Sequence, residues 1–146
     1  MAHRFALDFD VRDYECDLEG IVNHAVYLHY LEHARHVLLR QQGIDYAVLA
    51  QHGISMVVIR AELQYRRSLR SGDRFTVGTS VERASRLTVR FRHDVHRPAD
   101  GEHILSAAIT GTVVNAAGQP SLPAALEALF VALLDSGQQP ASSQTP

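Results

Sequence analysis

The feature that most constrains this chain is a single helix-like segment between one strand-like segment and a long run of others. Apolar residues recur at three- and four-residue spacing over 24–40, which predicts one long amphipathic helix. Residues 4–11 alternate between apolar and polar, as on a half-buried strand. Most of 55–115 alternates in the same way and predicts four more strands. One long helix facing about five antiparallel strands is an α+β layout, in which the helix covers one face of the sheet.

Turn-forming and capping residues mark the ends of these segments. Asn23 stands where the N-cap of the long helix is expected, and Gly43 ends that helix. Asp45 is placed to cap a short second helix over 46–51. In the first of the later strands, Val57, Ile59, Leu63 and other odd-numbered apolar residues should share one face. The predicted strands meet at turns over 71–73, 84–86 and 98–101.

Length and composition fit one domain. A chain of 146 residues can bury a core without metal or disulfide support, and its 46% hydrophobic content is ordinary for a globular protein. We expect a single domain over 1–135, with a terminal amphipathic or helical segment over 122–134. Residues 136–146 have the polar, proline-containing composition of a disordered tail.

Charge and cysteine content narrow the function classes. A formal net charge of −2 argues against binding of nucleic acid by the chain as a whole. The single cysteine, Cys16, excludes an internal disulfide and suits a reducing cytoplasm. No apolar run reaches the ~20 residues of a membrane span, and acids interrupt the first residues where a signal peptide is apolar. We expect a cytoplasmic protein that self-associates, because one helix leaves part of a sheet uncovered.

The densest polar cluster lies over 12–24, just ahead of the long helix. Its carboxylates precede a helix start, where free N–H groups can bind an oxyanion. Gly20 allows a tight turn, and His24 falls in the first helical turn. Glu15 lies two residues before Asp17 and would share its side if this segment were extended. A carboxylate beside a carbonyl that helix N–H groups hold is an arrangement suited to acyl transfer.

Residues 11–28, VRDYECDLEGIVNHAVYL, resemble the signature of the 4-hydroxybenzoyl-CoA thioesterase-like hotdog proteins. The sequence of this segment is most similar to the branch of the family that contains plant plastidial acyl-ACP thioesterases. The later segments 32–35, EHAR, and 69–73, LRSGD, also resemble the family, although Ser68 stands where the family usually has proline. The resemblance covers about 5–123. It implies a hotdog fold, in which a roughly five-stranded antiparallel sheet wraps one long helix.

The resemblance also implies a reaction and a site. The reaction is hydrolysis of acyl-CoA or acyl-ACP to a free acid and a thiol, without a cofactor, in a homodimer or homotetramer. Asp17 corresponds to the nucleophile or general base, and the backbone N–H of His24 to the group that polarises the thioester carbonyl. Gly20, Val22 and Asn23 are expected to contact the substrate beside them. Acyl length, and the choice between CoA and carrier protein, are left open.

Three later residues are weaker candidates for substrate binding. Ser85 and Arg86 resemble the family's contact to the nucleotide end, where arginine can pair with CoA phosphates. A solvated outer face of the sheet is the favoured interpretation of the basic residues in this region. Glu62 points opposite its apolar neighbours and is a candidate for a supporting role at a partner interface.

Other interpretations of the same residues remain open. Asp17 could be a loop acid or helix cap, and Cys16 is expected to pack because neighbouring acids disfavour its thiolate. His29, His33 and His36 lack the H-E-x-x-H order of a zinc helix, so no metal is predicted. Two alternative functions are a hotdog dehydratase or isomerase and a non-catalytic acyl-binding module.

Overall fold

The computed structural model describes residues 5–124, 126–128, 130 and 131. The predicted tail over 136–146 lies outside the described residues, as does part of the segment over 122–134. The elements in chain order are β1 (Phe5–Asp10), the 3-10 helix η1 (Asp13–Glu15), α1 (Val26–Gln41), α2 (Tyr46–Gln51), β2 (Ser55–Tyr65), β3 (Arg74–Arg83), β4 (Thr88–Arg97) and β5 (Glu102–Val114).

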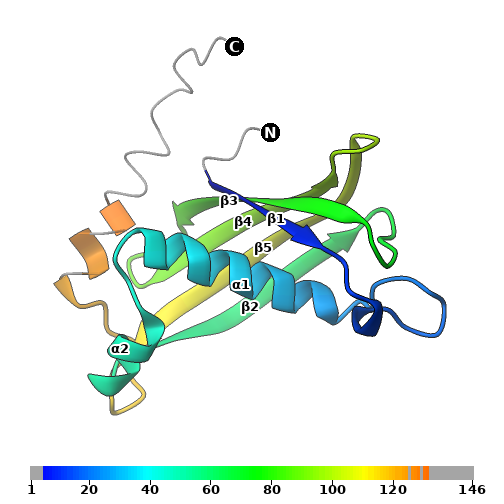
Figure 1. Ribbon diagram of the computed structural model, residues 1–146. Helices are drawn as coiled ribbons and strands as arrows, with labels where there is room; N and C mark the ends of the chain where they lie inside the picture. The colour runs from blue at the N-terminus through cyan, green and yellow to red at the C-terminus, as the bar shows by residue number, and fades with distance from the viewer. Residues whose placement is uncertain (1–4, 125, 129, 132–146) are drawn as a thin grey trace, which may run out of the picture.

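The strands form one antiparallel sheet in the order β1-β3-β4-β5-β2. Figure 1 shows α1 running across one face of this sheet, with α2 beside the start of β2. The predicted α+β layout of one long helix and five antiparallel strands is therefore confirmed. The two edge strands are β1 and β2, and β2 is the longer of them.

The core lies between the apolar stripe of α1 and the facing side of the sheet. Leu31 on α1 is fully buried, with 0% of its surface exposed, and Phe75 and Val77 on β3 are buried in the same cluster. Each such side chain stabilises the fold by about 1.5–3 kcal/mol relative to an exposed one. Apolar burial on one side of α1 therefore fixes which helix face turns away from the sheet. The α1 residues in the buried cluster are Tyr27, Tyr30, Leu31, Ala34, Leu38 and Leu39.

The start of α1 differs from the sequence prediction. The helix begins at Val26, two residues later than expected, and its N-cap position is Ala25 rather than Asn23. Asn23 forms a turn of its own, because its side chain accepts the N–H of Ala25 at 2.9 Å and its carbonyl accepts the N–H of Val26 at 2.9 Å. His24 therefore lies in the turn that leads into the helix. The second helix matches its prediction, with Asp45 accepting the N–H of Ala47 at 2.8 Å.

The predicted alternation along β2 is wrong in its first half. Met56 and Leu63 are the β2 residues that pack against the core, and they lie an odd number of positions apart. A regular strand would place such residues on opposite faces. A register shift between Val58 and Arg60 inserts one extra residue and brings both onto the same face. Val57 and Ile59 therefore do not continue the apolar stripe that contains Leu63.

Leu31→Ala is expected to lower the free energy of unfolding by about 2–5 kcal/mol, because it removes most of a fully buried side chain and leaves a cavity. Leu28→Ala is the matched control on the same helix, where 39% of the side chain is already exposed. We expect the control to cost less than about 1 kcal/mol. Urea unfolding at one fixed protein concentration measures both. Equal losses would contradict the assignment of this helix face to the core.

Candidate active site

A pocket of about 370 Å³ lies where the polar loop, the start of α1 and the end of β2 meet. It contains both residues that the sequence analysis singled out for catalysis, Asp17 and His24. The remaining lining combines apolar groups from the loop with aromatic and basic groups from α1 and from β2 and the residues after it. Its lining residues are Asp17, Ile21, Val22, His24, Tyr27, Tyr65, Arg66, Arg67 and Ser68.

Asp17 is held in a tight loop that closes on itself. Its backbone N–H donates to the carbonyl of Ile21 at 2.9 Å, and its carbonyl accepts the N–H of Gly20 at 3.0 Å. Gly20 has a φ of +76°, a conformation that favours glycine. One carboxylate oxygen, Oδ1, accepts the N–H of Glu19 at 2.8 Å. No hydrogen bond to Oδ2 is found among the described residues, which leaves that oxygen available to a ligand in the pocket.

His24 is fixed through its backbone rather than its side chain. Its carbonyl accepts the hydroxyl of Tyr65 at 2.9 Å, which joins the end of β2 to the start of α1. Within the described part of the chain, the N–H of His24 has no hydrogen-bond partner, whereas the N–H groups of Ala25 and Val26 are both bound. The imidazole is exposed. The backbone donor of His24 can therefore bind a ligand without breaking an internal bond.

Buried contacts anchor both ends of the loop. The N–H of Val22 donates to the carbonyl of Leu69 at 2.9 Å, and Leu69 is fully buried. Glu15 is buried as well, with its side chain accepting the N–H of Arg12 at 2.7 Å and its carbonyl accepting the N–H of Asn23 at 3.1 Å. Glu15 would share the side of Asp17 only in an extended segment, and η1 turns the backbone at Glu15 instead.

The turn over 69–73 packs beside the loop that carries Asp17 and is hydrogen-bonded to the residues before it. Gly72 has a φ of +82° and donates its N–H to the carbonyl of Val11 at 3.0 Å. Asp73 accepts the N–H of Arg70 at 2.9 Å and the guanidinium of Arg97 at 3.1 Å. The Ser71 hydroxyl also donates to Asp13. The glycine and aspartate that the sequence analysis matched to the family therefore connect the loop to β4.

The pocket combines neutral hydroxyl groups with cations at its edge. Burial raises the pKa of Tyr27 and of Tyr65, so both phenols stay neutral and able to donate at physiological pH. Arg66 and Arg67 are exposed at the end of β2, and Arg67 approaches Glu102 at 3.6 Å. The site can therefore offer a carboxylate, an unpaired backbone N–H and positive charge to one ligand.

The other residues predicted near the site contribute unequally. Val22 lines the pocket and is also part of the core. Gly20 and Asn23 shape the loop and the turn but do not line the pocket. Glu62 lies beside a separate, shallow depression with Arg92 and pairs with Arg60 at 2.6 Å. Glu62 therefore does not reach the Asp17 pocket of its own chain.

Ser85 and Arg86 lie at the opposite end of the sheet from Asp17. They form the turn between β3 and β4, where the N–H of Ser85 donates to the carbonyl of Thr88 at 3.2 Å. Thr88 is aligned with Thr112 on β5, which is aligned with Val57 near the start of β2. The Asp17 pocket lies at the end of β2, so one chain does not bring Ser85 and Arg86 to that pocket.

Tyr65 is one of the pocket residues that the sequence analysis did not predict. The alternation of β2 placed it on a strand, but nothing in the sequence pairs it with a carbonyl more than 40 positions away, as its bond to His24 requires. The available signal was the tyrosine that ends β2, since a tyrosine combines an apolar ring with a hydroxyl that can form a hydrogen bond.

The described residues contain no group of three or more histidine, cysteine, aspartate or glutamate side chains that could hold a metal ion. In the same part of the chain, no helix is both long and apolar enough to cross a membrane.

Comparison with known proteins identifies the class. Residues 11–130 match the model of the thioesterase-like superfamily. The acyl-acyl carrier protein thioesterase ATL3 of Arabidopsis thaliana is 30% identical over 135 residues, 92% of this chain and 71% of that protein. The related ATL2 is 33% identical over 108 residues, 74% of this chain and 56% of that protein. This chain therefore spans only part of these relatives.

Solved structures agree on the fold. A hypothetical protein of Thermus thermophilus is 25% identical with a TM-score of 0.83, covering 89% of this chain and 99% of that one. The 1,4-dihydroxy-2-naphthoyl-CoA thioesterase of Synechocystis has a TM-score of 0.83 at 14% identity, covering 90% and 97% of the two chains, which shows the fold alone.

The fold is that of the hotdog thioesterases, as the sequence analysis predicted. The chain belongs to the thioesterase-like superfamily, and its class of reaction is acyl-thioester hydrolysis.

Proposed function

We propose that this protein hydrolyses acyl-CoA or acyl-ACP at the Asp17 pocket, with Asp17 as nucleophile or general base. One observation carries the proposal: Asp17 and His24 line the same pocket. Among the described residues, neither Oδ2 of Asp17 nor the backbone N–H of His24 has a hydrogen-bond partner. A thioester carbonyl needs such a donor, because negative charge develops on its oxygen during attack.

Hydrolysis of the thioester can follow either of two routes. As a nucleophile, Asp17 forms a bond to the carbonyl carbon and expels the thiolate, which leaves a mixed anhydride that water cleaves to the acid and free Asp17. As a general base, Asp17 removes a proton from the attacking water, and the tetrahedral intermediate expels the thiolate directly. In both routes the His24 N–H stabilises the oxyanion, and the thiolate takes up a proton.

Thiol release tests the proposal. Purified protein is supplied with short, long and aromatic acyl-CoAs and with acyl carrier proteins, and the free thiol is measured with a chromogenic disulfide. We expect release from at least one donor class. A hotdog dehydratase or isomerase, or an acyl-binding module, would bind these thioesters without releasing thiol.

We also propose a dimer formed through the outer edge of β2. This edge strand exposes 55% of Val58 and 56% of Ile59, and no strand among the described residues pairs with its outer edge. Antiparallel pairing with a second β2 about a two-fold axis would satisfy the edge and extend the sheet. Such pairing brings the start of one β2 beside the end of the other.

Light scattering should therefore report at least a dimer at micromolar concentration. Ile59→Glu is expected to shift the protein towards monomer and to lower thiol release, because it adds a charge from each subunit to an exposed apolar part of the proposed interface. Val48→Glu, on α2 and also about half exposed at 48%, is the matched control and should leave the assembly unchanged. A fully active monomer would contradict the β2 dimer.

A further inference from the structure

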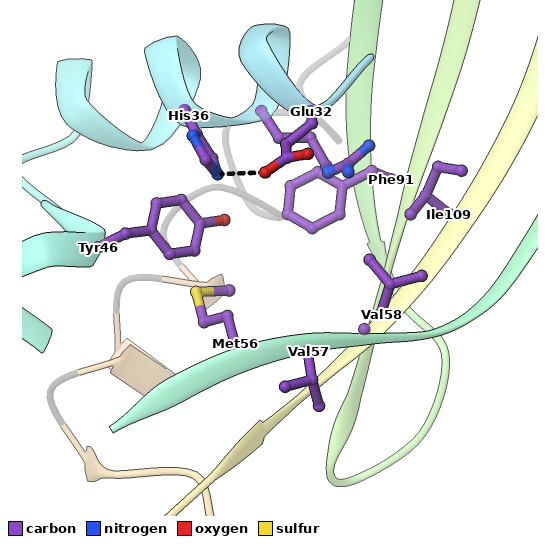
Figure 2. A pocket seen from close by; sticks show the side chains of 10 residues that line it. Glu32, His36, Tyr46, Met56, Val57, Val58, Phe91 and Ile109 are labelled. Carbon is purple, nitrogen blue, oxygen red and sulfur yellow. Dashed lines mark ion pairs between the residues drawn. The ribbon is translucent and has the colours of Figure 1, made fainter. Parts of the chain in front are cut away.

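A second pocket, the distal pocket, lies between the middle of α1, α2 and the start of β2 and encloses about 280 Å³. Figure 2 shows its mostly apolar wall, with Met56, Val58, Phe91 and Ile109 around the space. Polar side chains enter from the helices, and they include Arg35 and Tyr46. The mixture suits a ligand with an apolar body and one polar end.

Arg35 is the unusual member of this wall. Only 8% of its surface is exposed, and burial is the main cause that lowers its pKa. Its guanidinium donates to Nε2 of His93 at 3.2 Å and lies 5.9 Å from the centre of the Phe91 ring. Among the described residues, no carboxylate lies within salt-bridge distance of it. A guanidinium has five N–H donors, and a neutral imidazole nitrogen accepts only one of them.

Tyr46 presents a second free donor to the same space. In Figure 2 its ring points from α2 towards Phe91 with the hydroxyl foremost. That hydroxyl has no hydrogen-bond partner in the described part of the chain, and burial raises the pKa of Tyr46 to about 12. The phenol is therefore neutral and can donate to a ligand oxygen in the pocket.

The charges around the pocket favour a neutral oxygen over a carboxylate. Glu32 and His36 approach each other at 3.7 Å at its edge, as the dashed line in Figure 2 marks. Burial lowers the pKa of His36, so at neutral pH it adds no compensating charge to Glu32. The Glu32 carboxylate offsets the positive charge of Arg35 and repels a second anion.

The position of the distal pocket would bring it close to the catalytic pocket of a partner subunit. It lies at the start of β2, whereas Asp17 and Tyr65 lie at the end. In one chain the two pockets are separated by about 12 Å along α1, counting from Tyr27 in the catalytic pocket to Arg35 in the distal pocket. Antiparallel pairing of two β2 strands would put the distal pocket of one subunit beside the catalytic pocket of the other.

We propose that the distal pocket receives the far end of the acyl group bound in the partner subunit's catalytic site, and that Arg35 and Tyr46 select acyl groups bearing a hydroxyl or keto oxygen there. The proposal rests on the proposed thioesterase function and on the β2 dimer. The substrate class is thus an acyl thioester with an apolar chain or ring and a neutral oxygen at its far end.

The test compares thioesters that differ only at that end. Octanoyl-, decanoyl- and dodecanoyl-CoA are each paired with the ω-hydroxy compound, and kcat/KM is measured for every member. We expect the wild-type protein to prefer the hydroxyl at the length that fits, by roughly 10–100-fold, the scale of a hydrogen bond to a charged group. The ω-carboxy compound of that length should be a poorer substrate than the ω-hydroxy compound.

Three variants test whether Arg35 and Tyr46 cause the preference. Arg35→Met should bring the ratio of kcat/KM between the ω-hydroxy and plain members of a pair close to one, and Arg35→Lys should restore part of that ratio. Tyr46→Phe removes one hydroxyl from a half-buried position and should lower the preference several-fold even if Arg35→Met does not fold. Asp17→Asn is the control, because it should slow both members of a pair equally.

Several results would overturn the proposal. A wild-type ratio near one at every length would do so, as would an unchanged ratio in both Arg35→Met and Tyr46→Phe. Hydrolysis of plain acyl-CoAs in those cases leaves the thioesterase function standing. If no thioester is hydrolysed, the proposed thioesterase function is wrong, and calorimetry then tests the distal pocket alone. Tighter binding of 10-hydroxydecanoate than of decanoate, lost in Tyr46→Phe, would support the selection of a hydroxyl group in this pocket. Equal binding of the two acids would overturn it.

Mixed dimers test whether the pocket acts on the partner's site. One subunit carries Asp17→Asn and the other Arg35→Met, each with a different affinity tag so that only mixed dimers are purified. If Arg35 serves the partner, the one working Asp17 faces an intact Arg35 and the hydroxyl preference equals that of the wild type. A ratio like that of the Arg35→Met homodimer would overturn the assignment across the interface.

Discussion

Asp17→Asn is expected to lower the turnover number for thiol release by about 10²–10⁴, the scale for loss of a positioned base, and by more if Asp17 is the nucleophile. The amide is nearly isosteric, and its oxygen can still accept the Glu19 N–H that Oδ1 accepts at 2.8 Å. The loop should therefore keep its shape. What disappears is the charge on the oxygen that faces the pocket.

Glu19→Gln is the matched control for this variant. Glu19 is an exposed acid in the same loop and does not line the catalytic pocket, so its neutralisation should change turnover by less than about twofold. Circular dichroism and light scattering show whether both variants keep the fold and assembly. Wild-type turnover in a folded Asp17→Asn protein would remove the central claim of the proposed mechanism.

The sequence was informative where structure depends on local pattern. The 3.6-residue period of α1 and the Asp45 cap of α2 both arise from neighbours in the chain, and both were predicted correctly. The loop that carries Asp17 is also local, because Gly20 and Ile21 close it by backbone bonds over a few residues. The coincidence of Asp17 and His24 in one pocket could therefore be anticipated.

Features that depend on distant partners were missed. The bulge in β2 faces Gly111 on β5, where a Cβ would lie only 3.1 Å from the carbonyl oxygen of Val57. The absence of a side chain at Gly111 allows that close approach, and no pattern within β2 reports it. The Tyr65 bond to the His24 carbonyl is missed for the same reason. The contacts of Arg35 with His93 and Phe91 also depend on a distant segment, because both partners lie on β4.

The start of α1 shows how a small error in a boundary changes a mechanism. With the helix beginning at His24, its N–H would be one of several free donors at a helix terminus. The structure begins the helix at Val26 and binds the N–H groups of Ala25 and Val26 to Asn23. The N–H of His24 has no partner among the described residues and stays available to an oxyanion, so its removal tests the assignment of this donor.

His24→Pro is expected to lower turnover by about 10²–10³, the cost of removing one oxyanion donor. Proline deletes the N–H but keeps the carbonyl that the Tyr65 hydroxyl binds at 2.9 Å, so the link between α1 and β2 can persist. His24→Asn and His24→Ala keep the N–H and change only an exposed side chain, so we expect both to retain most activity. A 10²-fold loss in these two, with a pH–rate profile of changed shape, would instead assign the role to the imidazole.

Tyr65→Phe is a second test of whether the His24 N–H binds the thioester carbonyl, and it does not require the proline variant to fold. It removes the hydroxyl that holds the His24 carbonyl and leaves the N–H intact but less well oriented. We expect a loss of about tenfold in turnover with little change in KM, because the misplaced donor acts mainly on the transition state. Folding and light scattering of each variant are measured beside the kinetics. If His24→Pro assembles and hydrolyses thioesters normally, and Tyr65→Phe does too, the carbonyl is not bound at this turn and another donor must polarise it.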